Sequence, residues 1–447
     1  MNNRRCFKAV NSDFIRQIDT HNRIILMKRK MMAAFAAMMT IVSCGKTDEY
    51  GWVRSAVETA ESQLLLTADE IHGSGRIPRS IWTDYDMDML CRQLERDSTE
   101  FRDSLRKRPS PELLGKRRLA DIYDWTSGFY PGSLWIAYEL TSNPALETQA
   151  KHFTNLLEPL RHYTGTHDLG FMVRCSFGEA LSLSPADSIK DVIVETADNL
   201  ASRFRPETGV IRSWDFGKWN YPVIIDNMMN LDLLFDASRL TGDPKYKAVA
   251  VAHANTTMRC HFRDDMTTYH VVSYNDDGSV ECRQTFQGKA DESAWARGQA
   301  WGLYGFISCY ENTSDAVYLD RAVAIADMIM SRVVTEDAVP YWDYDAPVTE
   351  ETPRDASAGA VTASAMLELS QLPVSGAEKY YAYGEKILKS LSSPDYLAAP
   401  GTNEGFVLKH SVGSLPHGSE IDTPLNYADY YYLEALKRYI EIKKIDL

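Results

Sequence analysis

Apolar residues recur at helical spacing along most of the chain after residue 50. The apolar stripe returns every three or four positions, which is the period of an α-helix that buries one face. This pattern predicts twelve helices, at residues 52–68, 131–142, 147–162, 170–183, 187–204, 226–241, 244–262, 292–312, 316–333, 356–371, 376–394 and 424–442.

Local breaks in this pattern mark the connections. The segment TGDP at 241–244 ends one helix and starts the next, because Gly suits the position after a helix and Pro the first helical position. Residues 267–286 alternate instead, with NDDG at 275–278 between two β-rich runs. This segment predicts one small β-hairpin inserted into an otherwise helical chain.

Twelve helices joined mostly by short turns fit an all-α fold, the (α/α)6 barrel of six helical hairpins. Consecutive helices run in opposite directions in such a ring, so alternate helices begin at the same end. Because loops carry function disproportionately, we expect one shared site at that end. The alternative is that these Gly- and aromatic-rich segments only pack the end of the barrel. The segments in question are 124–133, 166–172, 214–227, 292–301, 355–357 and 401–423.

The charge of the chain limits its partners. The formal net charge is −14, and the first 44 residues carry eight Lys/Arg and two Asp/Glu, which leaves 40 basic and 60 acidic residues, or −20, in the remainder. Phosphate binding needs a basic face, so this balance argues against a nucleic-acid partner. An anionic substrate must then be met by local cations in a pocket.

The first 44 residues are predicted to be an export signal region. A basic KRK at 28–30 follows Met27, which we take as the true start, and the apolar run 31–42 is too short to span a bilayer. The sequence IVSC at 41–44 resembles a lipobox with Cys44 as the lipidated residue; a buried core helix is the alternative. We expect residues 45–447 to form one catalytic barrel domain. We also expect an exported protein whose only membrane contact is a lipid anchor in the cell envelope, in the periplasm or outer membrane.

Five further cysteines argue against a metal site. None forms a Cys-x-x-Cys pair, and the spacing of zinc ligands is absent from the sequence. Cys260 and Cys282 are a candidate disulfide pair, and most of the others suit small buried positions. The sequence also lacks a nucleophile elbow, a phosphate-binding Gly loop and a dinucleotide fingerprint, so we expect no cofactor. The five are Cys91, Cys175, Cys260, Cys282 and Cys309.

Two carboxylates are the candidates for acid and base chemistry. Asp168 and Asp226 follow loops and are bounded by apolar residues. Apolar surroundings raise the pKa of a carboxyl group, and a second carboxylate nearby raises it further, so that such a group can hold a proton near neutral pH. The alternative for Asp226 is a helix N-cap.

Aromatic residues and one arginine are the candidates for substrate contacts. Tryptophan rings give sugars a large apolar contact surface. Arg297, among small and aromatic residues, needs a buried partner, which is either a substrate carboxylate or an internal Asp. Trp301 follows it by four residues on the same helical face, whereas Trp295 suits either the wall or the core. The tryptophans at the expected barrel mouth are Trp125, Trp214, Trp219, Trp295 and Trp301.

Two polar residues near the hairpin remain open in role. His270 lies on its first strand, where a lone histidine is more often structural than catalytic. Gln287 follows the hairpin and is able either to bind a ligand or to cap a turn.

Five motifs in this order resemble the unsaturated glucuronyl hydrolases of glycoside hydrolase family 88, over about residues 50–445. The resemblance implies an (α/α)6 barrel, with Asp226 as general acid/base assisted by Asp168. It also implies substrate contacts from Trp125, Trp214, His270, Gln287, Arg297 and Trp301. The motifs are WTSGFYPG at 125–132, HDLGF at 167–171, DNMMN at 226–230, SAWARGQAW at 293–301 and YADYY at 427–431.

The reaction that the resemblance implies removes a 4,5-unsaturated uronic acid from the non-reducing end of polysaccharide-lyase products, such as glycosaminoglycan fragments. Asp226 protonates C4 and helps a water add at C5, and the hydrated sugar then rearranges and releases the next sugar. No attack at the anomeric carbon is needed, so carboxylate separation does not predict inversion or retention.

One departure concerns sulfate. Members that act on sulfated fragments can carry Ser-x-x-Ser-x-Lys in the C-terminal loop, whereas this chain has SLPHGS at 414–419. Ser414 is kept, but the second Ser and the Lys are not, and His417 is the alternative donor. The rival functions are an unsaturated rhamnogalacturonyl hydrolase and a non-catalytic glycan-binding surface lipoprotein. The HDLGF and WARGQ motifs favour the glucuronyl group, and two buried carboxylates favour an enzyme.

Overall fold

The computed structural model describes residues 48–96 and 110–447. The chain divides into two units, Met1–Glu49 and Tyr50–Leu447. The predicted lipobox and Cys44 lie outside the described residues. No helix among the described residues has the length and apolar character needed to cross a membrane.

The second unit is an (α/α)6 barrel. Its inner ring closes because each inner helix contacts the next in chain order and the last contacts the first. These helices are buried on nearly every side, which is why their apolar stripe is broad. They are α5 (Phe129–Thr141), η3 (Gly170–Gly178) with α7 (Glu179–Leu183), α9 (Asn227–Thr241), α11 (Ala296–Thr313), α13 (Ala356–Leu369) and α15 (Asn426–Lys443).

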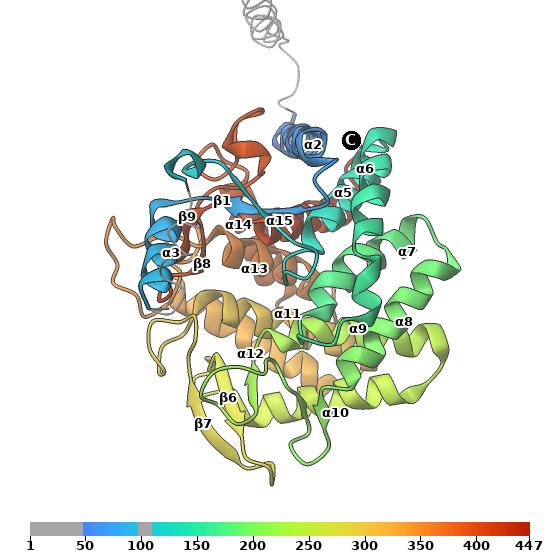
Figure 1. The fold of residues 1–447 in the computed structure, drawn as a ribbon, viewed down its shortest axis with the longest axis vertical. Helices are drawn as coiled ribbons and strands as arrows, with labels where there is room; N and C mark the ends of the chain where they lie inside the picture. The colour runs from blue at the N-terminus through green and yellow to red at the C-terminus, as the bar shows by residue number, and fades with distance from the viewer. Residues whose placement is uncertain (1–47, 97–109) are drawn as a thin grey trace, which may run out of the picture. The chain divides into compact units, whose positions relative to one another are not determined.

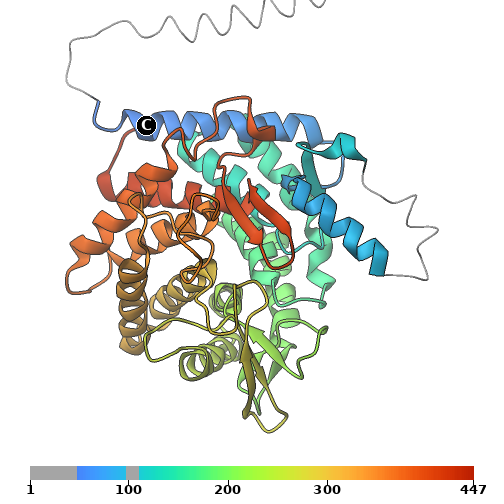
Figure 2. The same ribbon diagram turned by 90° about the vertical axis from the view of Figure 1, so that its left-hand side faces the viewer.

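The outer ring alternates with the inner one along the chain, as the ring of helices in Figures 1 and 2 shows. Its helices keep a clear amphipathic pattern because only one face is covered. Several begin with an Asn or Asp whose side chain caps the first turn, as Asp243 does for α10. They are α2 (Gly51–Ile71), α6 (Pro144–Leu156), α8 (Asp187–Ala201), α10 (Pro244–Cys260), α12 (Ala316–Arg332) and α14 (Ala377–Leu391).

All twelve predicted helical segments are confirmed, with two differences in type. The segment predicted as one helix at 147–162 is α6 followed by the 3-10 helix η2 (Glu158–His162). The segment predicted as one helix at 170–183 begins as a π-helix, η3, and continues as α7. The connection predicted at 241–244 is also present. Gly242 lies in the left-handed region at φ 73°, and the Asp243 side chain caps α10 by accepting a hydrogen bond from the Lys245 backbone N–H.

The prediction of a single β-hairpin is too simple. The hairpin β6 (Val271–Tyr274) and β7 (Val280–Gln284) is present, and β5 (Pro222–Ile224) adds to β6 as a third strand. Such strands are too short to show the two-residue alternation that reveals a strand in a sequence. The other antiparallel pairs in the described chain are β1 (Ile77–Ile81) with β2 (Arg117–Ala120), β3 (Phe204–Arg205) with β4 (Val210–Ile211), and β8 (Ser411–Ser414) with β9 (Ser419–Thr423).

Shorter helices complete the unit, and α3 (Asp84–Arg96) was not predicted. Figure 2 shows the β8–β9 hairpin, in red, in front of the barrel, with α3, in blue, to one side. Figure 1 shows β6 and β7 extending from the lower edge. The 3-10 helices are η1 (Pro111–Leu113), η2 (Glu158–His162) and η4 (Asn403–Gly405).

Candidate active site

The starts of the inner helices bring the predicted polar residues together. Asp226 is the N-cap residue of α9, Arg297 is the second residue of α11, and Asp355 is the N-cap residue of α13. Asp168 lies two residues before η3. The charges of Arg297 and Asp168 both act on the Asp226 carboxyl group, so these segments, far apart in the sequence, share one site.

Asp226 occupies a capping position without capping. Its side chain is 9% exposed, and within the described chain it makes no capping hydrogen bond and its Oδ1 atom has no hydrogen-bond partner. Burial raises the pKa of Asp226 to about 7, with Arg297 lowering it and Asp168 raising it. The carboxyl group is therefore able to carry a proton near neutral pH and to give it up.

The His270 ring lies beside this carboxyl group. Its Nδ1 accepts hydrogen bonds from the backbone N–H groups of Phe286 and Gln287, each at 3.0 Å. That role assigns the ring proton to Nε2, which lies 3.6 Å from Asp226 Oδ1. Burial lowers the pKa of His270 well below its ordinary value, so the ring is neutral.

Asp168 lies in a more polar setting than Asp226. Its Oδ2 accepts a hydrogen bond from Thr166 Oγ1 at 2.7 Å, and its Oδ1 lies 3.3 Å from His167 Nε2. The side chain is 17% exposed, so water reaches it. Two carboxyl groups with such different surroundings are suited to different roles in one reaction.

A carboxamide links the two acidic segments. Asn230 Oδ1 accepts a hydrogen bond from the Phe171 N–H at 2.9 Å, and its Nδ2 donates to the Asp226 carbonyl at 3.4 Å. The approach is close enough that a Cβ at Gly170 would lie 2.5 Å from the Asn230 Cα. Glycine at 170 therefore allows η3 and α9 to meet at the site.

The structure favours the internal-Asp alternative for Arg297. Its guanidinium is 1% exposed, and Nη1 donates to Asp355 Oδ2 at 2.9 Å and to the Val412 carbonyl. Nη2 donates to the Gly413 carbonyl at 2.8 Å. Arg297 thus ties α11 to α13 and to β8, and its two terminal nitrogens are directed at protein atoms.

The predicted tryptophans differ in their surroundings. Trp125 packs against Tyr427 with ring centroids 5.0 Å apart and is partly exposed, whereas Trp301 is fully buried and packs against Phe171 at 5.2 Å. The Trp301 indole N–H is among the buried donors that have no partner in the described residues. Trp295 is buried beside His270, with centroids 4.6 Å apart.

Gln287 and Ser414 meet at the β8–β9 hairpin. Gln287 Nε2 donates to the Gly413 carbonyl at 3.0 Å, and Ser414 Oγ lies 2.6 Å from His417 Nδ1. Burial lowers the pKa of His417, so at pH 7 this imidazole carries less positive charge than an ordinary histidine. His417 therefore does not supply the full charge of the lysine that the sulfate-binding pattern has in this loop.

An ion cluster that sequence reasoning missed fixes the same hairpin. Glu420 Oε2 accepts a hydrogen bond from Arg79 Nη2 at 3.0 Å, and Arg79 also pairs with Asp124. Burial alone raises the pKa of Glu420, but Arg79 and Arg118 lower it to about 2. These residues come from distant segments without a shared motif, so no sequence pattern links them.

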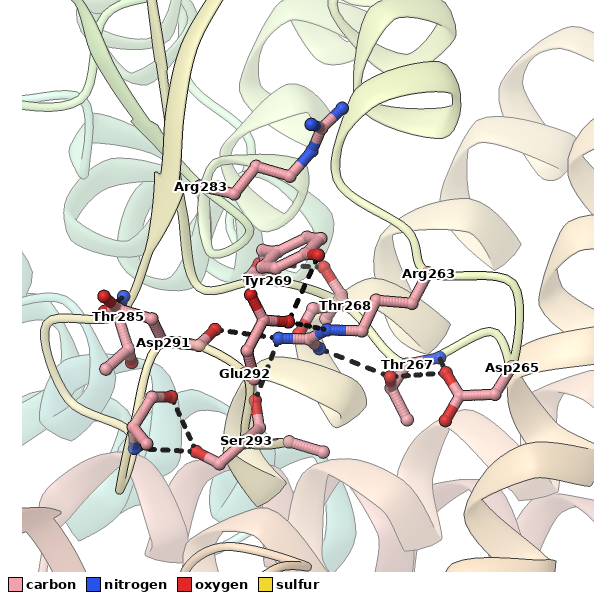
Figure 3. A network of polar contacts seen from close by, with 12 residues as sticks. Arg263, Asp265, Thr267, Thr268, Tyr269, Arg283, Thr285, Asp291, Glu292 and Ser293 are labelled. Atoms are coloured by element: carbon pink, nitrogen blue, oxygen red, sulfur yellow. Dashed lines mark hydrogen bonds and ion pairs between the residues drawn. The ribbon is translucent and has the colours of Figure 1, made fainter.

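A second polar network fixes the segment between β7 and α11. Figure 3 shows the Arg263 side chain reaching from the loop after α10 toward residues 291–293. Its Nη2 donates to the Asp291 carbonyl at 2.9 Å, and its Cζ lies 3.8 Å from the centre of the Tyr269 ring. This segment precedes Arg297, and its start carries Gln287.

A cavity of about 1200 Å³ lies beside the β8–β9 hairpin. Its lining includes Tyr85 of α3, Leu415, His417 and the segment 350–354, but neither Asp226 nor His270. The chemistry of the site is therefore not in this cavity.

The candidate disulfide is not present. Cys260 and Cys282 are both free, as are the other cysteines that the structure describes. Within residues 48–96 and 110–447, no group of three or more His, Cys, Asp or Glu side chains is arranged to hold a metal ion.

Comparisons with known proteins place the chain in a family. Family models match residues 27–96, as a domain of unknown function, and residues 302–446, as glycosyl hydrolase family 47. Each covers a minor part of the chain. An unsaturated glucuronyl hydrolase from Formosa agariphila is 45% identical over 334 residues, which are 74% of this chain and 82% of that protein.

Solved structures agree with this relative. A crystal structure of an unsaturated glucuronyl hydrolase specific for heparin has 46% identity and a TM-score of 0.80, covering 89% of this chain and 99% of that one. An unsaturated glucuronyl hydrolase from Streptococcus agalactiae complexed with dGlcA-GalNAc6S has 26% identity and a TM-score of 0.70, covering 91% and 98%. The chain belongs to the unsaturated glucuronyl hydrolases, and it is a glycosidase of this family.

Proposed function

We propose that this enzyme removes a 4,5-unsaturated uronic acid from the non-reducing end of lyase-generated oligosaccharides, by hydration of the C4=C5 double bond. The observation that carries the proposal is the Asp226 carboxyl group, which is buried, does not cap its helix and has a pKa raised to about 7. Protonation of a carbon atom at neutral pH needs such an acid.

The chain's own residues supply each proton transfer. The protonated Asp226 gives its proton to C4, and a new C–H bond forms as the double bond is lost. The resulting carboxylate takes a proton from the water whose oxygen bonds to C5. The product is a hemiketal, which opens and releases the next sugar. The Asp168 carboxylate stabilises the positive charge that develops on the ring.

His270 is proposed to orient the acid. Its Nε2 lies 3.6 Å from Asp226 Oδ1, just beyond hydrogen-bond distance, and both residues are buried. Trp125, Trp214 and Trp301 are proposed to line the sugar site, with Gln287 and Ser414 as polar contacts. We propose that Arg297 acts by holding α13 and β8 in place, because its terminal nitrogens bind Asp355 and two backbone carbonyls.

The two rival functions are less well supported. Relatives with 45% and 46% identity are unsaturated glucuronyl hydrolases, which favours a glucuronyl substrate over a rhamnogalacturonyl one. A non-catalytic glycan-binding protein needs no buried carboxyl group with a pKa near 7. A panel of lyase-generated disaccharides tests the choice, with loss of the absorbance of the conjugated double bond as the measurement. Turnover of rhamnogalacturonan fragments alone would support the first rival, and binding without turnover the second.

The value of kcat/KM should fall on the alkaline side of the pH profile, with a pKa of about 7. The reaction needs the protonated form of Asp226, and this form is lost as the pH rises through the raised pKa of its carboxyl group. The negative charge of the Asp168 carboxylate contributes to the raised pKa of Asp226. Asp168→Asn should therefore move the alkaline limb to lower pH. Rates measured between pH 5 and 9 test this, and a limb that stays in place would show that Asp168 does not act on the acid.

We propose that the exported protein is anchored in the cell envelope by a lipid on Cys44. The support is the basic segment at 28–30, the apolar run at 31–42 and the IVSC sequence at 41–44. Mass spectrometry of the native membrane fraction should find a chain that begins at Cys44 and carries acyl mass, and Cys44→Ser should release the protein from that fraction. A chain that begins before residue 44 without acyl mass would contradict the proposal.

A further inference from the structure

An aromatic surface extends outward from the candidate site. Phe286, whose backbone N–H binds His270, has its ring 5.3 Å from that of Trp214 and 5.9 Å from that of Trp219. Phe216 stacks on Trp214 with centroids 5.3 Å apart and an interplanar angle of 17°. We call Trp214, Phe216, Trp219 and Phe286 the aromatic platform.

The side chains of the aromatic platform differ in their exposure to solvent. Trp214 is only 8% exposed, whereas Phe216 is 59% exposed, which is unusual for a phenylalanine. Trp219 is held in orientation because its Nε1 donates to Gln284 Oε1 at 2.8 Å. Gly217, at φ 88°, makes the turn that places Phe216 and Lys218 on either side of it.

One cation on the platform is available to a ligand. Lys218 is exposed, and its Nζ lies 5.6 Å from the centre of the Trp219 ring. In the described part of the chain it forms no hydrogen bond or ion pair. The neighbouring Asp215 does not oppose an anion strongly, because Arg203 and Arg212 pair with it at 3.0 and 3.2 Å.

We propose that Phe216, Trp219 and Lys218 form a further subsite that binds an anionic sugar beyond the leaving sugar, and this inference rests on the proposed function. Exposed aromatic rings bind the apolar faces of sugars, and a free ammonium group binds a carboxylate or sulfate on the same sugar. The platform begins one residue from Gln287, so it continues the proposed substrate site outward. The net negative charge of the protein makes such a local cation necessary for an anionic chain.

The test compares an unsaturated disaccharide with an unsaturated tetrasaccharide whose third sugar carries a carboxylate. Lys218→Gln should lower kcat/KM for the tetrasaccharide about two- to fivefold, as expected for one exposed charge contact. Phe216→Ala should lower it about three- to tenfold through lost ring contact. Neither change should alter kcat/KM for the disaccharide by more than about twofold, because that substrate does not reach the subsite.

Two controls sharpen the comparison. Carboxyl reduction of the third sugar, or about 1 M salt, should remove the effect of Lys218→Gln because the contact is electrostatic. Tyr85→Ala is the matched control for Phe216, since Tyr85 is 53% exposed and lines the cavity beside the β8–β9 hairpin, which no platform residue lines. It should leave both substrates unaffected.

The outcomes separate this inference from the proposed function. If the enzyme turns over the disaccharide but Lys218→Gln and Phe216→Ala leave the tetrasaccharide unaffected, the subsite is refuted and the function stands. A loss with Tyr85→Ala instead would place the extended chain in the cavity and also refute the subsite. An enzyme that turns over neither substrate would overturn both proposals.

Discussion

Asp226→Asn should abolish turnover while leaving the barrel folded. Asparagine is nearly the same size as aspartate but carries no transferable acidic proton, so kcat should fall by about 10²–10⁴-fold or more. The fold should persist because the Asp226 side chain makes no capping hydrogen bond in the described structure that the exchange could break. Steady-state rates and circular dichroism of the same sample measure the two properties.

Asp243→Asn is the matched control. Asp243 is also an N-cap aspartate, but its carboxylate does cap, accepting a hydrogen bond from the Lys245 N–H at 2.9 Å. Asparagine caps equally well, so both stability and kcat should stay near wild type. An Asp226→Asn variant that retained half of the wild-type kcat would show that Asp226 is not the acid.

Arg297→Ala should destabilise the protein strongly. Arg297 and Asp355 are both buried, and removal of one partner leaves the other charge without compensation, which costs about 3–5 kcal/mol in the free energy of unfolding. The same change should release the β8–β9 hairpin, because Arg297 holds the carbonyls of Val412 and Gly413. Denaturant unfolding measures the first effect, and kcat/KM the second.

A double-mutant cycle with Asp355→Ala isolates the pair. The two single losses of stability should sum to more than the loss in the double variant, since each removes the same interaction. Arg332→Ala is the control: Arg332 pairs with Asp265 and Asp345, all three side chains are about one third exposed or more, and its loss should cost at most about 1 kcal/mol. If Arg297→Ala left stability unchanged and reduced activity only toward substrates with an intact uronate carboxylate, Arg297 would bind substrate instead.

The helices were predictable because each buries a stripe whose period survives in the sequence. The short strands were not, since β3, β4 and β5 have too few residues for alternation to appear. The start of the segment at 170 was predicted as an ordinary helix. Its π-helical winding occurs where Gly170 and Phe171 meet Asn230 of α9, a contact that no local pattern encodes.

The candidate site, too, was predictable where local sequence motifs carry it and not where only the fold brings residues together. Asp168, Asp226, Trp125, Trp295 and Trp301 lie in local motifs near helix starts, so their grouping at one end of the barrel followed from the alternation of helix directions. The partner of Arg297 was left open between a substrate carboxylate and an internal Asp. Asp355 lies 58 residues further along the chain, and only the folded ring brings the two together. The platform residue Phe216 lay in no motif.

The most direct test of the central claim is to follow a lyase-generated disaccharide in heavy water with the wild-type enzyme and with Asp226→Asn. Proton transfer from Asp226 to C4 predicts that the absorbance of the double bond is lost, that one deuterium becomes bound to C4 of the released uronate, and that the variant does neither. Release of the next sugar with the double bond intact and no deuterium at C4 would instead show attack at the anomeric carbon, and would contradict the account.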